Sequence, residues 1–226
     1  MAETVVRREV LQFLVQLKKN NNREWFADHK KEFKALEAGV KGFYNTLFER
    51  MKSHDELEKL KMFRIYRDVR FSHDKSPYQA HFAGSFSRAG ASRRGGYYLR
   101  IKPGESFIAS GFWAPEKKDL LRIRKELEQD ASGFRKVISS HPLKAIWGNL
   151  QGNEVKTAPK GFAREHPDMD LIKKKQFIFV RNFGDKELVS PKFIEEVNTS
   201  FKAIRPYFNL MSEILTTNLN GESLLK

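Results

Sequence analysis

The sequence predicts an α+β fold in a single domain, residues 1–226, in which helices flank one curved, mainly antiparallel sheet of about five or six strands. Three observations support this prediction. Apolar residues recur at helical spacing near both ends of the chain, and the middle of the chain alternates short β-rich runs with polar turns. No linker or shift in composition separates two independent cores.

The composition restricts the class of protein. Of the 226 residues, 40% are hydrophobic and 19 are Phe, which is enough apolar material for a buried core. The 42 Lys and Arg residues against 28 Asp and Glu give a net charge of +14, which favours anionic ligands or partners. The absence of Cys excludes disulfide scaffolds, thiol nucleophiles and thiolate metal centres.

Targeting and membrane signals are weak. The apolar cluster at residues 10–17 is short and interrupted by glutamines, which is not typical of a signal peptide. No run reaches the roughly 18 apolar residues that a membrane-spanning helix needs. We therefore expect a cytoplasmic protein with no membrane partner.

Two helices are expected in the N-terminal part of the chain. The first is amphipathic, with an apolar stripe through residues 6–17. After a cap and turn at residues 20–22, a long helix is expected over residues 23–51, where apolar residues recur seven apart. A break in this helix is expected at Gly39 or Gly42.

An antiparallel meander is expected next, followed by one more strand. The turn at residues 103–106 has the sequence PGES and the length of a tight hairpin connection between two β-rich runs. The expected strands are residues 62–67, 81–86, 97–102, 107–113 and 176–181.

Helices and an irregular segment are expected after the meander. A proline precedes a charged amphipathic helix at residues 116–129, and a shorter helix follows at residues 134–139. Glycines and a proline punctuate residues 143–164, which indicates a loop or short hairpin.

A final helix is expected from Ser190 onward. Ser190 is a suitable N-cap, and Pro191 suits the first helical position. Pro206 lies within the apolar stripe of this helix and is expected to kink it.

Residues 64–82 hold the densest mixture of cations, carboxylates and phenols in the chain. Because successive side chains of a strand point to opposite faces, one face of this segment is polar. The hairpin at residues 97–113 has a polar face of its own. If these faces coincide, one surface carries Arg64, Tyr66, Asp68, Tyr98 and Arg100.

One interpretation of this segment is a basic cleft for a small anionic ligand, which includes phosphorylated ligands. Guanidinium groups bind carboxylate or phosphate through paired donors. Asp68 and Asp74 would fix the arginines or act as general acid and base. The ligand-binding residues would be Arg67, Arg70, Lys75, Tyr78, Tyr98 and Arg100, with Trp113 and Lys160 on the rim.

The other interpretation is structural. Arg67 and Arg70 can pair with Asp68 and Asp74 and so pin a strand to a loop, while Lys75 stays solvated. Spacing alone leaves both interpretations open.

The motif RDVRFSHDKSPY at residues 67–78 resembles the signature of a bacterial and fungal family called domain of unknown function 2461. The resemblance covers roughly residues 8–220. It brings no activity, cofactor or catalytic residue, but it implies that residues 67–78 form a shared site. Further blocks in the same order are FL at residues 13–14, NNREWF at 21–26, GYY at 96–98, PGES at 103–106, GFWAP at 111–115, TAPKGF at 157–162 and HP at 166–167.

Metal and cofactor sites have little support in the sequence. His166, Asp168 and Asp170 are close in sequence, but their loop context favours capping of a following helix. His73 and His81 would meet only if the loop between them folded back. No nucleotide-binding glycine loop, nucleophile elbow or zinc-protease motif is present, so no metal is expected and any cofactor stays unknown.

Nucleic-acid binding is the main alternative function. The basic loop at residues 87–96 carries Arg88, Arg93 and Arg94, which suit contacts to phosphates. No recognition helix, zinc finger or RNA-binding motif accompanies it. A basic face that docks an acidic protein is a third possibility. Binding of a small anionic ligand is the expected function, while enzymatic activity and oligomeric state are left open.

Overall fold

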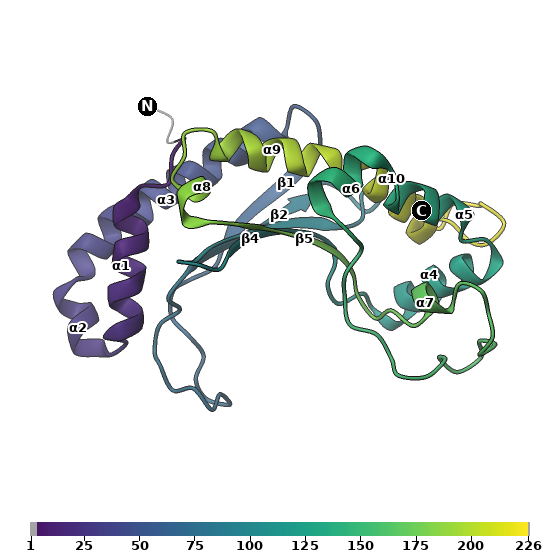
Figure 1. The fold of residues 1–226 in the computed structure, drawn as a ribbon, viewed down its shortest axis with the longest axis horizontal. Coiled ribbons are helices and arrows are strands. Elements are labelled where there is room, and N and C mark those ends of the chain that lie inside the picture. Colours follow the sequence, from purple (N-terminus) through teal and green to yellow (C-terminus); the bar gives the residue numbers. More distant parts are fainter. Residues whose placement is uncertain (1–3, 226) are drawn as a thin grey trace. The chain divides into compact units, whose positions relative to one another are not determined.

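The structure, a computed structural model, describes residues 4–225 and confirms the α+β fold (Figure 1). Its sheet is antiparallel and open, and the five strands lie side by side in chain order. Four of the strands match the predicted ones to within two residues at each end. The strands are β1 (Leu57–Met62), β2 (Phe82–Arg88), β3 (Gly96–Ile101), β4 (Ser106–Phe112) and β5 (Phe177–Phe183).

The chain divides into two compact units that share the strands of the sheet. The first unit holds the N-terminal segment up to Phe86, together with Tyr98–Ile108 and Asn182–Thr199. The second unit holds Ser87–Tyr97, Ala109–Arg181 and the segment from Ser200 onward. The single-domain organisation stays a prediction. In the part of the chain that the structure describes, no helix combines the length and the apolar character needed to cross a membrane.

Helices of the first unit cover one face of its part of the sheet. Tyr44 of α3 (Lys30–Met51) donates a hydrogen bond from its hydroxyl to the Leu99 carbonyl at 2.9 Å. Phe43 of the same helix stacks on Phe193 of α9 (Phe193–Ala203) with ring centroids 5.7 Å apart. Gly84 is required below Tyr44, because an added Cβ would lie 2.7 Å from the tyrosine ring. The helices of this unit are α1 (Arg8–Lys19), α2 (Arg23–Asp28), α3 (Lys30–Met51), α8 (Asp185–Leu188) and most of α9 (Phe193–Ala203).

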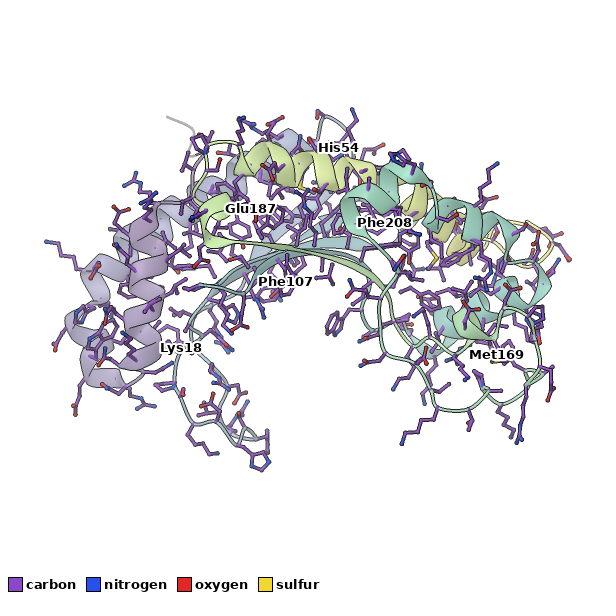
Figure 2. The ribbon with its side chains drawn as sticks, viewed as in Figure 1. Lys18, His54, Phe107, Met169, Glu187 and Phe208 are labelled. Carbon is purple, nitrogen blue, oxygen red and sulfur yellow. The ribbon has the colours of Figure 1, made fainter. Side chains whose placement is uncertain are left out.

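The opposite face of the sheet in the first unit carries polar and aromatic side chains. Strand alternation places Ala83 of β2, Tyr98 of β3 and Phe107 of β4 on this face, and His81 directly precedes β2. Figure 2 shows Phe107 on the side of the sheet away from α9. This face positions the candidate site.

The second unit has its own aromatic core. Tyr97 packs edge-on to Phe208 with ring centroids 5.0 Å apart, and the Tyr207 hydroxyl donates to the Phe177 carbonyl at 2.9 Å. Gly111 has a φ of +130°, and a Cβ there would lie 2.2 Å from the Phe177 carbonyl oxygen, so only glycine fits. The helices of this unit are α4 (Lys117–Gln129), α5 (Ser132–Ile138), α6 (His141–Trp147), α7 (Met169–Ile172), α10 (Arg205–Thr216) and the end of α9.

The prediction of a strand at residues 62–67 was wrong. The strand β1 lies one segment earlier, and Tyr66 pairs only in an isolated bridge with Tyr78. The edge strand β1 is largely exposed and rich in Lys and Glu, so it lacks the apolar alternation that would identify it. The aromatic residues after it enter a loop instead.

The predicted break in the N-terminal helix was placed wrongly. The chain breaks at His29, between α2 and α3, and α3 runs through Gly39 and Gly42. Asn22 caps α2 by accepting from the Trp25 N–H at 2.9 Å. A single glycine costs a helix only about 1 kcal/mol, which the buried face of α3 offsets.

Two further boundaries differ from the prediction. The C-terminal helical region begins at Phe193 rather than at Ser190, because residues 190–192 form a turn in which the Ser190 carbonyl accepts from the Phe193 N–H at 3.0 Å. Pro206 does not kink one helix but marks the first turn of a separate helix, α10. The segment at residues 143–164 begins as helix α6 and then pairs with the β5 region through the bridge of Gln151 to Ile178.

Candidate functional site

Residues 67–77 form a loop whose base is a short antiparallel pairing. The Arg67 N–H donates to the Pro77 carbonyl at 2.9 Å, and the Gln79 N–H donates to the Ile65 carbonyl at 2.6 Å. Tyr78 is buried and stacks on Phe26 of α2 with ring centroids 4.0 Å apart. The loop is therefore anchored at its base to the N-terminal helices.

Within this loop, both carboxylates pair with arginines. Arg70 forms a fork with Asp68, with Nε at 3.0 Å from Oδ1 and Nη2 at 2.6 Å from Oδ2. Arg67 pairs with Asp74, and Lys75 donates to the Val69 carbonyl at 3.0 Å. This is the pairing that the structural interpretation of the motif expects.

These contacts lower the pKa of both carboxyl groups. The hydrogen bond from Arg70 is the main cause for Asp68. Hydrogen bonds from the Ser76 hydroxyl and N–H, followed by Arg67, hold the pKa of Asp74 far below its usual value. A carboxylate held ionised in this way is a poor proton carrier near neutral pH, so the geometry favours a bracing role for both residues.

A pocket of about 360 Å³ lies next to the base of the loop, and we call it the sheet pocket. Phe63 and Arg64 reach it from the segment after β1, and Tyr66 and Gln79 reach it from the base of the loop. The sheet supplies the rest of the lining. The lining residues are Phe63, Arg64, Tyr66, Gln79, His81, Ala83 and Tyr98, all in the first unit.

The polar side chains of the sheet pocket keep their hydrogen-bonding groups available. In residues 4–225, the side chains of Arg64, Tyr66, Gln79, His81 and Tyr98 form no hydrogen bond and no ion pair. Arg64 thus differs from Arg67 and Arg70, whose guanidinium groups are paired with carboxylates. A hollow bordered by a few polar side chains with available donors and acceptors is a candidate ligand site.

Burial and neighbouring cations set the charge state of the pocket. Burial, followed by repulsion from Arg100 and Lys102, lowers the pKa of His81 to about 4. Burial also raises the pKa of the Tyr98 phenol. At neutral pH, His81 therefore offers one donor and one acceptor without charge, and Arg64 is the cation of the lining.

An aromatic row crosses the same face of the sheet. Phe63 and Tyr98 have ring centroids 6.3 Å apart, and Tyr98 and Phe107 are 5.6 Å apart. The Lys61 ammonium lies 5.5 Å from the Phe63 centroid, and the Arg100 guanidinium lies 4.3 Å from the Phe107 centroid. The aromatic row is therefore Phe63, Tyr98 and Phe107, with one cation over each end.

The structure brings together part of the predicted set of site residues. Of the predicted ligand-binding residues, Tyr98 lines the sheet pocket, and it does so with Arg64 and Tyr66 of the predicted polar surface. Arg100 stacks on Phe107 and donates to the Glu105 carbonyl at 2.9 Å. The predicted residues that lie elsewhere are Arg67, Asp68, Arg70, Asp74 and Lys75 in the loop, the supporting Tyr78, and the exposed Trp113 and Lys160 of the second unit.

Phe63, Gln79 and Ala83 were not predicted as site residues from the sequence, and His81 was considered only as a metal ligand. One sequence pattern could have indicated part of this lining. Gln79, His81 and Ala83 follow one another at spacing two, so an extended chain places them on one face.

The three arginines of residues 87–96, the predicted nucleic-acid-binding loop, contact other residues of the second unit. Arg88 is buried, donates to the Arg94 carbonyl at 2.7 Å and lies 5.1 Å from the Phe208 centroid. Arg94 pairs with Asp119 of α4. Arg93 donates to the Ala89 carbonyl at a long 3.5 Å. Arg88 and Arg94 thus hold the loop in place.

The candidate metal ligands near His166 have other partners. His166 accepts from the Asp168 N–H at 3.1 Å and donates to the Glu128 carbonyl at 3.1 Å. Arg135 binds Asp168 and Asp170, each at 2.6 Å, so the Asp168 side chain does not cap α7. No cluster of three His, Cys, Asp or Glu side chains that could hold a metal ion occurs between residues 4 and 225.

The comparisons with known proteins identify the family. No curated protein and no solved structure matches the chain. A family model described as "Conserved hypothetical protein (DUF2461)" matches residues 9–209, which include the loop, the sheet pocket and the aromatic row. The chain therefore belongs to the DUF2461 family, as the motif at residues 67–78 predicted.

Proposed function

We propose that the protein binds a small anionic ligand, a carboxylate or a phosphate, in the sheet pocket. The observation that carries this proposal is the set of five polar side chains whose hydrogen-bonding groups are unused. Arg64 would bind the anionic group through paired guanidinium donors. The neutral groups of Tyr66, Gln79, His81 and Tyr98 would orient the rest of the ligand.

The surroundings of the pocket favour an anion. Burial is the largest cause of the low pKa of His81, and Arg100, Lys102 and Arg67 lower it further, while Glu105 opposes them in part. The positive potential of these three cations favours a negative charge nearby. The chain as a whole carries a net charge of +14, which would also attract an anion from solution.

The motif loop would support this site. Its internal ion pairs would brace the loop, and its base supplies Tyr66 and Gln79 to the pocket. In this proposal the Asp68 and Asp74 carboxylates fix Arg70 and Arg67 and do not act as general acid and base. The lack of cysteine suits the reducing cytoplasm, where we propose that the protein acts.

Calorimetric titration with inorganic phosphate, pyrophosphate and small dicarboxylates tests this proposal. Arg64→Gln and Arg70→Gln form a matched pair, because each removes one positive charge but only Arg64 lines the pocket. Loss of a charged hydrogen bond costs about 1.5–3 kcal/mol, so Arg64→Gln should weaken binding roughly 10- to 150-fold. Arg70→Gln should leave the dissociation constant nearly unchanged.

The opposite pattern would locate the anion elsewhere. If Arg70→Gln abolishes binding and Arg64→Gln does not, the ligand lies on the motif loop and the sheet pocket is not the site. If only oligonucleotides bind, in a salt-dependent way that Arg93→Gln weakens, the protein binds nucleic acid through residues 87–96.

A further inference from the structure

We infer that the ligand of the sheet pocket has a planar heteroaromatic ring attached to its anionic group, as a nucleoside phosphate has. This inference rests on the proposed anion binding and specifies the class of ligand. It comes from the juxtaposition of the pocket and the aromatic row on one face of the sheet in the first unit.

The aromatic row offers ring faces to a ligand. Phe63 is 44% exposed although it is fully apolar, and Tyr98 beside it is partly exposed. Both residues line the pocket, so their exposed faces border the same hollow. Stacking on aromatic side chains is the usual way in which proteins bind nucleobases. A site for phosphate or a small carboxylate alone has no use for these rings.

The small residue beneath the rings leaves room for a planar group. Ala83 belongs to β2, the strand between β1, which Phe63 directly follows, and β3, which carries Tyr98. The Ala83 carbonyl accepts from the Phe63 N–H at 2.9 Å. Ala83 is only 3% exposed, so neighbouring side chains already cover most of it, and its methyl group forms the floor of the pocket. No longer side chain at this position fills the pocket.

The polar groups at the edge of the pocket match the edge of a heterocycle. A Gln79 amide presents both a donor and an acceptor, and neutral His81 presents one of each. Nucleobases present adjacent donors and acceptors along their edges. Because the pKa of His81 is about 4, the imidazole keeps its acceptor at neutral pH.

The cations suit a phosphate beside the stacked ring. Arg64 lines the pocket, and Lys61 has its ammonium 5.5 Å from the Phe63 centroid. Neither side chain forms an ion pair in the part of the chain that the structure describes. A base on Phe63 would thus lie within reach of two unpaired positive charges.

Comparing ligands that differ only in the ring tests the inference. The probes are the four nucleoside 5′-monophosphates, ribose 5-phosphate, inorganic phosphate and a 5′-phosphorylated trinucleotide, titrated at two salt concentrations. Base stacking is worth about 1–3 kcal/mol, so a nucleotide should bind roughly 5- to 150-fold more tightly than ribose 5-phosphate. Phe63→Leu should remove this difference, and Phe63→Trp should keep it. Phe71→Leu is the control, because Phe71 is 97% exposed and lies outside the pocket lining.

Each outcome separates the two proposals. Equal affinities for nucleotide and ribose 5-phosphate, both lost in Arg64→Gln, would overturn the ring inference and leave anion binding intact. Binding that is indifferent to Arg64→Gln would overturn both. A trinucleotide that binds more tightly than the mononucleotides, with the same dependence on Phe63, supports the inference and identifies the end of a nucleic-acid strand as the source of the ligand.

Discussion

Asn21 clamps the backbone of Tyr78 across 57 positions of sequence. Its Nδ2 donates to the Tyr78 carbonyl at 2.9 Å, and its Oδ1 accepts from the Tyr78 N–H at 3.1 Å. Asn21 follows α1, and Tyr78 closes the base of the motif loop. Two of the sequence blocks that identify the family therefore meet at one pair of hydrogen bonds.

The first prediction concerns this clamp. Asn21→Ala removes both bonds and leaves a partly buried carbonyl and N–H without partners, so we expect a loss of about 1–3 kcal/mol in the free energy of unfolding. Urea denaturation measures this change in the free energy of unfolding. Amide exchange should also speed up at residues 65–79. Asn21→Asp keeps the acceptor and loses the donor, and it should fall between the wild type and Asn21→Ala. Equal stability of all three proteins would contradict a structural role for the clamp.

The second prediction is a pH dependence from His81. Its pKa is lowered from 6.5 to about 4 in the folded protein, mainly by burial, so the unfolded chain binds the proton more tightly. Stability is therefore full above about pH 6.5 and is lost as the pH falls toward 4. Water reaches part of the ring, so the loss should be on the order of 1 kcal/mol.

A variant isolates this contribution. His81→Gln cannot titrate, so the difference between the wild-type and His81→Gln unfolding free energies should vary with pH between about 4 and 6.5 and be constant above that range. Chemical denaturation at several pH values measures both curves. A constant difference across the whole range would show that His81 titrates normally.

The third prediction compares two glycines with opposite surroundings. Gly84→Ala places a Cβ 2.7 Å from the buried Tyr44 ring, and we expect a loss of about 1–3 kcal/mol in the free energy of unfolding. Gly39→Ala meets no atom within 4 Å inside α3, and we expect a gain of roughly 0.5–1 kcal/mol. Thermal unfolding of the two variants tests the expected opposite signs.

The fourth prediction concerns the Arg94 and Asp119 pair of the second unit. Asp119 is 8% exposed, so Asp119→Ala leaves Arg94 without its partner and should cost about 1–3 kcal/mol. The control is Glu116→Ala, which breaks the exposed pair with Lys118 and should change stability little. Denaturation curves that coincide for the two variants would show that the pair of Arg94 and Asp119 does not stabilise the fold.

Several elements follow from local patterns alone. The hairpin of β3 and β4 was predictable because the PGES turn lies between two runs of alternating residues. Helices α1 and α4 were predictable because their apolar residues recur at helical spacing. The motif at residues 67–78 was enough to predict the family.

Other boundaries depended on specific side-chain contacts or on strand pairing, which apolar periodicity does not reveal. The break between α2 and α3 lies at His29. Asn22 caps the start of α2, and His29 Nδ1 contacts the Trp25 carbonyl at 2.8 Å at its end. The exposed strand β1 exists because β2 pairs with it, and its own residues carry little β signal.

The order of residues alone was enough to predict the fold class, most of the periodic elements and a motif rich in arginines and carboxylates, and it sets the net charge. The partners of each arginine became visible only in the folded chain. Arg64 and Arg70 are equivalent as residue types, but the turn of the loop brings Asp68 to Arg70, while Arg64 lines the sheet pocket and forms no hydrogen bond or ion pair within residues 4–225. That difference arises because pairing depends on where the backbone turns and on which strands lie side by side, and neither is encoded in the spacing of charges.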